Sequence, residues 1–242
     1  MKTEIMYEDK DLFVIRKPAG LATQTARVGQ ADVVSELKNY MVASGAPKPP
    51  YLGIIHRLDQ PVEGLLVFAK NKKAAAALTK QLGGQGEDCT LSKHYYAVLC
   101  GKPPQKEGEL VDYMYKDMQE TGKAVIVENY TEDSGKGGKK AVLQYRILQT
   151  VGTRSGEDIS LADIRIETGR FHQIRAQMAH AGMALLGDEK YADEAVKACS
   201  RGLGIRTVAL CARSLSFIHP VTGEELHFNT EPRSKAFSFF KL

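Results

Sequence analysis

One stretch decides the fold of this chain, and it reads Ile54-Ile55-His56-Arg57-Leu58-Asp59-Gln60-Pro61-Val62-Glu63-Gly64-Leu65-Leu66-Val67-Phe68-Ala69-Lys70. A charged group with Asp59 at its end lies between an apolar pair and the apolar run from Leu65 to Ala69. A run of that length, bounded by proline and glycine, is typical of a buried strand. The turn that carries Asp59 is therefore expected at the edge of a core, where a carboxylate is costly unless it is paired or used. A structural aspartate that caps the turn is the alternative.

A second stretch reads Glu167-Thr168-Gly169-Arg170-Phe171-His172-Gln173-Ile174-Arg175 and is followed by Leu185-Leu186-Gly187-Asp188. The residues before it alternate between apolar and polar, which is the period of a half-buried strand. Thr168-Gly169 interrupts that strand, and the segment from His172 to Ala181 predicts a helix that Gly182 terminates. Ile174, Met178 and Ala181 share a face of this helix that we expect in the core, whereas His172 and Arg175 share another face.

Both stretches resemble the active-site motifs of the RluA-type pseudouridine synthases. The usual family forms are His-Arg-Leu-Asp-x-x-Thr-Ser-Gly-Leu-Leu-Leu and Gly-Arg-x-His-Gln-Ile-Arg followed by Leu-Leu-Gly-Asp. The resemblance implies that Asp59 is the catalytic nucleophile and that Arg175 pairs with it. It also implies substrate contacts from Arg57, His172 and Ile174. Such a pairing suits the chemistry, because a guanidinium favours the ionised form of a partly buried carboxylate and fixes its direction.

The resemblance extends over nearly the whole chain. Lys93-His94-Tyr95-Tyr96-Ala97 is similar to the family motif Lys-x-Tyr-x-Ala, whose tyrosine stacks on the target base, and this implies that role for Tyr95. The neighbouring Tyr96 points to the opposite face of the strand and is expected in the core. The opening segment Lys17-Pro18-Ala19-Gly20-Leu21 and the closing segment His219-Pro220-Val221-Thr222-Gly223-Glu224 also resemble the family.

Two departures from the family pattern stand out. Val62-Glu63 replaces the usual Thr-Ser, which adds a carboxylate near Asp59. The sequence also starts directly with the catalytic domain, without the small RNA-binding module that many relatives carry in front. We therefore expect one catalytic domain over residues 1–242, with target selection by that domain itself.

The remaining elements form a mixed order of strands and helices. Apolar patterns predict a hairpin over residues 5–15, a helix over 33–43, and a helix over 72–82 that Asn71 caps. Further strands are predicted over residues 95–100, 123–128, 141–150, 208–218 and 225–228. Strands predominate and helices are inserted irregularly, which indicates an α+β fold with a mixed, largely antiparallel sheet and flanking helices and loops.

Composition agrees with a globular enzyme. The chain has 33 basic and 29 acidic residues, a net charge of +4, which is mild for a protein that binds nucleic acid. Its lysines are concentrated at positions where they can contact phosphates, although solubilising surface charge is the alternative: Lys70, Lys72, Lys73, Lys80, Lys136, Lys139 and Lys140. No apolar stretch approaches the roughly 18 residues of a membrane span, and no signal region precedes the first strand, so no membrane partner is expected.

Neither a metal nor another cofactor is expected. The four cysteines lack the paired spacing of a zinc ribbon and are read as reduced thiols of a cytoplasmic protein. The histidines His56, His94, His172 and His180 are too widely spaced for a helical ligand pair. The chemistry that the resemblance implies involves neither redox change nor phosphoryl transfer.

The sequence therefore predicts a monomeric RNA pseudouridine synthase that acts on ribosomal or transfer RNA and not on DNA. It would flip a uridine out of the RNA, attack with Asp59, break the glycosidic bond and rejoin the uracil through carbon 5. Two alternatives stay open at this point. One is a catalytically silent RNA-binding protein or RNA-folding chaperone. The other is a glycosidase or nucleosidase, which normally needs a pair of carboxylates and has only Glu63 as a close second acid.

Overall fold

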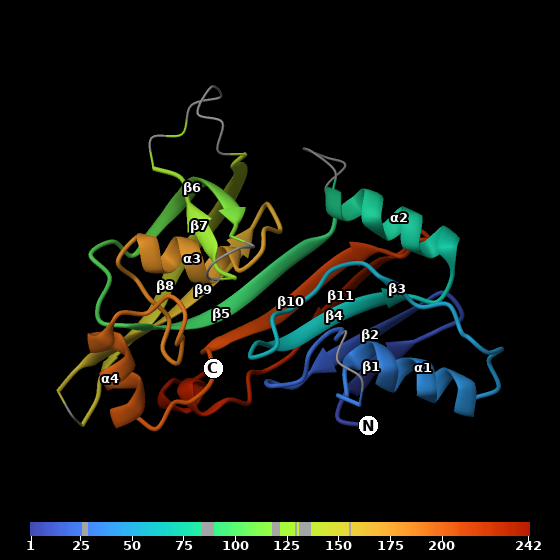
Figure 1. Cartoon of the computed structure of the whole chain (residues 1–242), viewed down its shortest axis with the longest axis horizontal. Helices are drawn as coiled ribbons and strands as arrows, with labels where there is room; N and C mark the ends of the chain where they lie inside the picture. Colours follow the sequence, from blue (N-terminus) through green and yellow to red (C-terminus); the bar gives the residue numbers. More distant parts are fainter. Residues whose placement is uncertain (26–28, 84–89, 118–121, 129, 131–136, 155) are drawn as a thin grey trace. The chain divides into compact units, whose positions relative to one another are not determined.

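The computed structural model describes residues 1–25, 29–83, 90–117, 122–128, 130, 137–154 and 156–242. These residues form two compact units, each with a sheet and flanking helices (Figure 1). Unit 1 comprises Met1–Lys93 and Cys211–Pro232, and unit 2 comprises His94–Leu210 and Arg233–Leu242. The predicted α+β class is confirmed. A single catalytic domain over residues 1–242 stays a prediction.

The sheet of unit 1 is centred on the predicted buried strand. Its order is β1 (Glu4–Glu8), β2 (Leu12–Lys17), β4 (Glu63–Ala69), β10 (Leu210–Ile218) and β11 (Glu225–Asn229). β10 runs parallel to the start of β4, and the short β3 (Gly53–Ile54) pairs antiparallel with the end of β4. The pairs β1–β2, β2–β4 and β10–β11 are antiparallel, so the predicted hairpin over residues 5–15 is confirmed.

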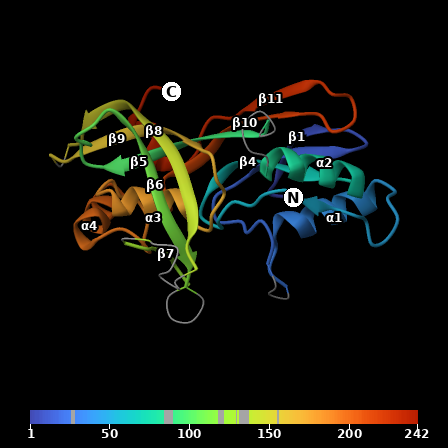
Figure 2. The ribbon, with the colours of Figure 1, turned by 90° about the horizontal axis from the view of Figure 1, so that it is seen from above.

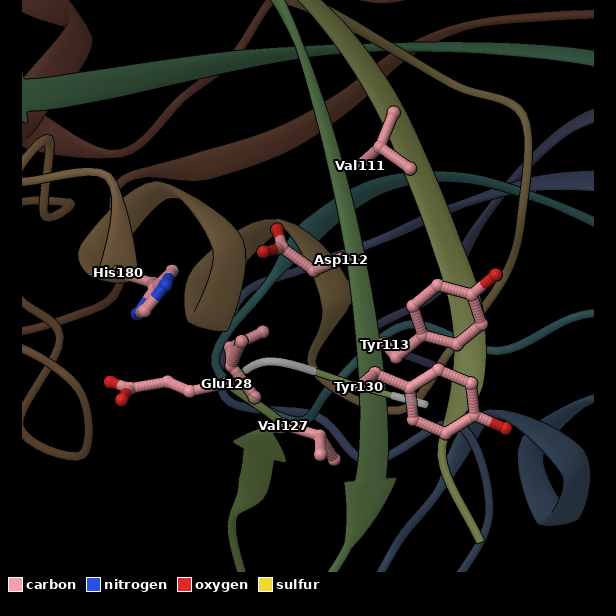
Figure 3. Close-up of a pocket in the computed structure, with 8 residues that line it drawn as sticks. Val111, Asp112, Tyr113, Val127, Glu128, Tyr130 and His180 are labelled. Carbon is pink, nitrogen blue, oxygen red and sulfur yellow. The ribbon is translucent and has the colours of Figure 1, made fainter. Parts of the chain in front are cut away.

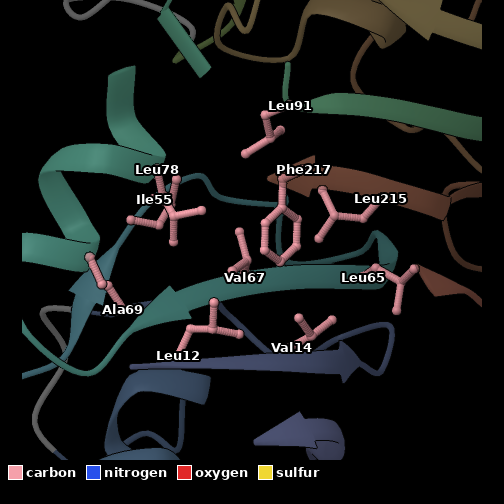
Figure 4. Packing of buried hydrophobic residues seen from close by; sticks show 11 residues of the cluster. Leu12, Val14, Ile55, Leu65, Val67, Ala69, Leu78, Leu91, Leu215 and Phe217 are labelled. Atoms are coloured by element: carbon pink, nitrogen blue, oxygen red, sulfur yellow. The ribbon is translucent and has the colours of Figure 1, made fainter. Parts of the chain in front are cut away.

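Every residue of β4 is buried, because apolar side chains pack against both of its faces. On one face, Leu65, Val67 and Ala69 join a cluster with Ala74 and Leu78 of α2 (Lys72–Gly83), as Figure 4 shows for ten labelled members. The helix α1 (Val33–Ala43) lies against β2, where Tyr40 meets Phe13 edge to face at 6.1 Å between ring centroids. Both helices were predicted. Asn71 caps α2 as expected, because its Oδ1 accepts from the amide of Ala74 at 2.9 Å.

Gly64, the glycine that follows the turn of Asp59, is required by the approach of β10. Its φ is +123°, a conformation that side chains with a Cβ rarely adopt. A Cβ at this position would overlap the backbone of Ala212, the β10 residue that pairs with Gly64. The glycine of the motif is therefore a condition for the pairing of β4 with β10.

Unit 2 contains a fully antiparallel sheet in its described part. Its order is β5 (Ser92–Cys100), β9 (Asp158–Ile166), β8 (Lys139–Gly152), β6 (Glu107–Lys116) and β7 (Ala124–Ile126). α3 (Gln173–His180) lies beside β7 (Figure 2). α4 (Glu194–Gly202) and a short 3₁₀ helix (Lys235–Phe239) complete the unit. Among the described helices, none is both long and apolar enough to cross a membrane.

Several sequence predictions for unit 2 need correction. The strand predicted over residues 123–128 is only three residues long, and β6 and α4 were missed. β6 carries no clear apolar alternation, because Glu107 and Glu109 flank a glycine at its start, Val111 is exposed and Asp112 is partly buried. Ala181, expected in the core, is exposed because α3 ends at His180. Cys100, Cys199 and Cys211 are free thiols, and Cys89 lies outside the described residues.

Candidate active site

Asp59 lies in a tight turn between β3 and β4. The amide of Val62 donates to the carbonyl of Asp59 at 3.0 Å and closes the turn. Leu58 and Val62 are only 7% and 1% exposed, whereas Asp59 is partly exposed. The core therefore anchors both sides of the turn, and the Asp59 carboxylate lies at the boundary between core and solvent, where the sequence predicted it.

The loop that follows β2 holds this turn. The Thr23 hydroxyl donates to the carbonyl of Leu58 at 2.9 Å and accepts from the Leu58 amide at 3.2 Å. The Gly20 amide donates to the carbonyl of Gln60 at 2.9 Å, and Nε2 of Gln60 donates to the carbonyl of Gly20 at 3.0 Å. Four hydrogen bonds thus fix the residues on both sides of Asp59. Sequence reasoning missed Thr23, because a threonine in a loop carries no signal of its distant partner.

Lys17 is a buried cation next to the same turn. Its side chain is fully buried, and Nζ donates to the carbonyls of Pro18 at 3.1 Å, Leu21 at 2.6 Å and Gln60 at 3.0 Å. Burial lowers the pKa of Lys17 to about 7, while the negative charges of Asp59 and Glu63 oppose this shift. Lys17 thus ties the loop to the turn and supplies positive charge near Asp59 when it is protonated.

Glu63, the additional carboxylate of the motif, points into the core and is paired there. Its Oε2 lies 3.1 Å from Nη2 of Arg16, and the two side chains are 4% and 5% exposed. Nη1 of Arg16 also lies 3.6 Å from the more exposed Glu4. A carboxylate that is buried against an arginine is badly placed to act as a second acid or base in solvent-accessible chemistry.

His56 and Arg57 precede the turn and differ in their surroundings. Nε2 of His56 accepts from the amide of Val67 at 3.4 Å, so this nitrogen carries no proton. Burial and the nearby charge of Lys93 hold the pKa of His56 well below its ordinary value, and the ring is neutral. Arg57 is exposed, and its contact with a substrate stays a prediction.

In unit 2, the second motif forms the start of α3. Oε1 of Gln173 accepts from the Thr168 hydroxyl at 2.8 Å and from the Arg170 amide at 3.0 Å. His172 lies between them with φ of +53°, in the left-handed region that non-glycine residues avoid. Strain of this kind persists only where the surroundings hold it, and it is frequent at functional sites. Ile174 is 5% exposed and packs into the core, as predicted for its helix face.

Arg175 is held by a partner that sequence reasoning did not assign to it, Asp188. Nε and Nη2 of Arg175 donate to the two Asp188 oxygens at 2.7 and 2.8 Å, and both side chains are buried. Oδ1 of Asp188 also accepts from the amides of Lys190 and Tyr191. The Leu-Leu-Gly-Asp segment thus orients the arginine of the motif. The pairing of Arg175 with Asp59 would join the two units and stays a prediction.

Tyr95 lies on β5, opposite Ile164 of β9. It is 5% exposed, whereas Tyr96 is partly exposed. The expectation that Tyr96 is the core residue of this pair is therefore wrong. The stacking role of Tyr95 stays a prediction.

The lysines expected to contact phosphates differ in availability. Nζ of Lys70 is bound by Glu8 at 2.8 Å and lies over the ring of Phe13, so Lys70 stabilises unit 1. The exposed members are Lys72, Lys73, Lys80, Lys139 and Lys140. Lys136 lies outside the described residues.

A hollow of about 430 Å³ in unit 2 lies apart from the motifs (Figure 3). The stacked rings of Tyr113 and Tyr130, 3.9 Å apart, form one side, and Asp112, Glu128 and His180 lie toward the other. Asp112 already accepts from Gln177 at 2.7 Å. None of the predicted site residues lines this hollow.

A cluster of Asp9, Asp11 and His219 in unit 1 has the composition of a metal site. Nδ1 of His219 accepts from the amides of Val221 and Thr222, so the proton of the neutral ring is on Nε2, which donates to Asp9 at 2.7 Å. A cation at Nε2 would require the lone pair that this tautomer lacks. The cluster is better suited to fastening two hairpin turns than to holding a metal.

The comparisons with known proteins point to one family. Residues 11–180 match the family described as RNA pseudouridylate synthase. The chain is 32% identical to ribosomal large subunit pseudouridine synthase D of Zymomonas mobilis, over 99% of this chain and 72% of that protein. It is 34% identical to ribosomal large subunit pseudouridine synthase D of Neisseria meningitidis serogroup B, over 94% of this chain and 58% of that protein.

A solved structure shows the same fold. Human RNA pseudouridylate synthase domain containing 1 aligns with a TM-score of 0.72 at 20% identity, over 95% of this chain and 83% of that chain. At this identity the likeness shows the fold alone. The described strands and helices are thus arranged as in a protein of the matched family.

Proposed function

Because the chain belongs to the RNA pseudouridylate synthase family, and is thus an RNA-modifying isomerase, we propose that it converts uridines of structured ribosomal or transfer RNA to pseudouridine with Asp59 as the nucleophile. The reaction breaks the bond between N1 of uracil and C1′ of the ribose and forms a bond between C5 and C1′. The proton on C5 is lost and N1 gains one, so the RNA keeps its composition. The base has to leave its stack for this chemistry.

The observation that carries the proposal is the fixed turn of Asp59. A nucleophile must be held in a productive geometry and remain reachable. Leu58 and Val62 are buried on either side of a partly exposed Asp59, and Thr23 holds the Leu58 backbone. This combination supports a reactive carboxylate, because the neighbouring residues hold the turn in place while Asp59 itself remains reachable from solvent.

The remaining predicted site residues enter as parts of the same proposal. Arg175 would orient Asp59 or the substrate, and its bidentate contact with Asp188 supports a rigid guanidinium. Tyr95 would stack on the target uracil. Arg57 and His172 would contact the RNA around it, and the buried Ile174 would support this part of the site from the core. We further propose that the protein acts as a monomer, without a cofactor, in the cytoplasm where these RNAs are used.

Replacement of Asp59 by Asn tests the proposal. The amide is nearly isosteric but a far weaker nucleophile. With RNA that carries tritium on C5 of uridine, extracted from cells lacking this protein, the wild-type chain should release tritium and Asp59→Asn should not. Asp158→Asn, an exposed carboxylate of unit 2, is the matched control and should behave as wild type. Substantial turnover by Asp59→Asn would refute the nucleophile.

The same assay separates the alternatives. A silent RNA-binding protein would release no tritium in wild-type form, and a glycosidase would release free uracil instead of pseudouridine. The burial of Glu63 against Arg16 also argues against the glycosidase alternative, since that reaction needs a second carboxylate and Glu63 is the close second acid. Comparing pseudouridines in cells with and without the protein would identify the modified RNA and position.

A further inference from the structure

A continuous series of rings and cations extends from Arg175 to an exposed lysine in unit 2. The Arg175 guanidinium carbon lies 5.2 Å from the centroid of Tyr191, whose ring meets His172 edge to face at 5.6 Å. The His172 ring stacks on Phe171 with 3.7 Å between centroids and 21° between planes. Nζ of Lys116 lies 4.6 Å from the centroid of Phe171. We call these five residues the aromatic column.

The part of the aromatic column formed by Tyr191 and His172 is fixed in place. The Tyr191 hydroxyl accepts from the amide of Ala124 at 2.6 Å and shares a hydrogen bond with Nδ1 of His172 at 2.8 Å. His172 also has the left-handed backbone conformation described above. The His172 imidazole that stacks on Phe171 is thus held by Tyr191 and by the backbone conformation of His172. Phe171 therefore stacks on a ring that is held in one position.

Phe171 is half-buried and packs against the core of unit 2, and among the described residues Lys116 is the cation that lies over its ring. Since the imidazole of His172 occupies one face of the ring, the Lys116 ammonium over the ring lies at the other. Lys116 is exposed, and a cation–π contact at an exposed site is weak. A flat aromatic ligand could displace this ammonium at little cost and would leave it free to bind an anion nearby.

The surroundings of the aromatic column are basic. Lys123 lies over Tyr191 at 6.0 Å, and the exposed Lys190 reaches the carbonyl of Gly122. Arg170, next to Phe171, is exposed and donates through Nε to the carbonyl of Lys140 at 2.8 Å. A stacking ring with one cation over it and further cations along the aromatic column suits single-stranded nucleic acid, because each nucleotide offers a flat base and an anionic phosphate.

We propose that Phe171 stacks on a base next to the modified uridine and that Lys116, displaced from the ring, binds a neighbouring phosphate. This inference rests on the proposed function, because Phe171 directly precedes His172 and lies four residues before Arg175, and both of those residues are assigned there to the substrate. Phe171 occupies the unspecified position of the Gly-Arg-x-His motif, so neither the motif nor the composition could assign it a role.

Equilibrium binding tests the proposal without any need for turnover. The probe is a fluorescently labelled single-stranded oligoadenylate of about twelve nucleotides, followed over a range of salt concentrations. Phe171→Ala should weaken binding about 5- to 100-fold, and Phe171→Leu should weaken it similarly although it keeps the apolar contact with the core. Phe171→Tyr, which retains a flat ring, should bind within about twofold of wild type.

Lys116→Ala tests the phosphate contact separately. It should lower the slope of log affinity against log salt by about 0.7, the effect of one phosphate contact on a single strand. Lys102→Ala removes an exposed lysine elsewhere in unit 2 and should leave the slope unchanged. Thermal unfolding of each variant shows whether the fold is intact.

Wild-type affinity in Phe171→Ala or Phe171→Leu would overturn the stacking contact, and an unchanged salt slope in Lys116→Ala would overturn the phosphate contact. These outcomes are independent of the catalytic test. If Asp59→Asn keeps full turnover, the proposed nucleophile fails while a binding loss in Phe171→Ala still stands. If Asp59→Asn is inactive and Phe171→Ala binds normally, the proposed function stands and the aromatic column is structural.

Discussion

The Thr23 hydroxyl is bonded to both backbone groups of Leu58, at 2.9 Å to its carbonyl and at 3.2 Å to its amide. Leu58 directly precedes Asp59, so this one side chain fixes the peptide that carries the proposed nucleophile. Thr23 is 3% exposed and distant in sequence from the turn, and its hydroxyl both donates and accepts. Removing the hydroxyl would leave two buried backbone groups without that partner.

Thr23→Val should lower kcat with little change in KM, because the variant keeps the shape of the side chain and loses its hydrogen bonds. A misplacement of about 1 Å at a reacting group can cost about a hundredfold in rate, so we expect a fall of about ten- to a hundredfold. Steady-state tritium release measures it. Thr23→Ser, which restores the hydroxyl, should recover most of kcat, and failure of this rescue would contradict a positioning role.

Arg175 and Asp188 provide a second prediction. Asp188→Asn removes the anion that holds a buried guanidinium, which should lower the free energy of unfolding by about 3–5 kcal/mol. Arg175→Lys keeps the charge but loses the planar fork, so activity should fall strongly while the variant remains folded. Urea unfolding and saturating turnover, measured on both variants, separate the two effects. A wild-type kcat in Arg175→Lys would show that the fork is not needed for catalysis.

Features with a local pattern could be predicted from the sequence. The buried strand β4 is an apolar run between proline and glycine, and α2 has a capping asparagine and a terminal glycine, so each element is specified by neighbouring residues. The turn of Asp59 follows from its position before that strand. The resemblance to a family then supplied roles that no pattern of spacing could have supplied, such as the stacking assigned to Tyr95.

Features that depend on distant contacts could not be predicted. Thr23 meets Leu58, Lys17 meets the carbonyl of Gln60, and Arg16 meets Glu63 only after the strands have paired. Strand β6 was missed because its exposed and partly buried positions do not follow an apolar alternation, and its place in the sheet comes from pairing with β8. These contacts define the surroundings of the proposed site more than the motifs themselves do.

The buried pair of Arg16 and Glu63 provides a third prediction. Glu63→Gln leaves the Arg16 charge buried without its 3.1 Å partner, so the free energy of unfolding should fall by about 3 kcal/mol, the lower end for a broken buried pair because Glu4 remains near. Turnover of the folded variant should stay within about threefold, since a paired carboxylate in the core performs no proton transfer.

Glu4→Gln is the control for Glu63→Gln. Glu4 is 47% exposed and 3.6 Å from Arg16, and an exposed pair contributes only about 0–1 kcal/mol. The double variant Arg16→Met/Glu63→Leu should regain stability, because an apolar pair of similar size avoids burying charge. A large loss of turnover in a folded Glu63→Gln variant would mean that Glu63 takes part in the chemistry.

The pKa of Lys17 provides the last prediction. Burial lowers this pKa to about 7, whereas in the unfolded chain it returns to the ordinary value of 10.5. Between these pH values the unfolded state binds more protons than the folded state, so the contribution of Lys17 makes the free energy of unfolding rise with pH. The rise is at most about 1.4 kcal/mol per pH unit, and below about pH 7 the contribution is constant because both states are protonated.

Lys17→Met removes this titration. Both proteins are unfolded with urea from about pH 6 to pH 9.5. The free energy of unfolding of wild type minus that of Lys17→Met should be constant at the acidic end and increase above about pH 7. Lys102→Met, at an exposed position of unit 2, should show no such trend relative to wild type. A difference between wild type and Lys17→Met that does not vary with pH would mean that the three carbonyls around Nζ keep Lys17 charged. In that case the proton is retained because all three N–H bonds of the ammonium have acceptors, at Pro18, Leu21 and Gln60.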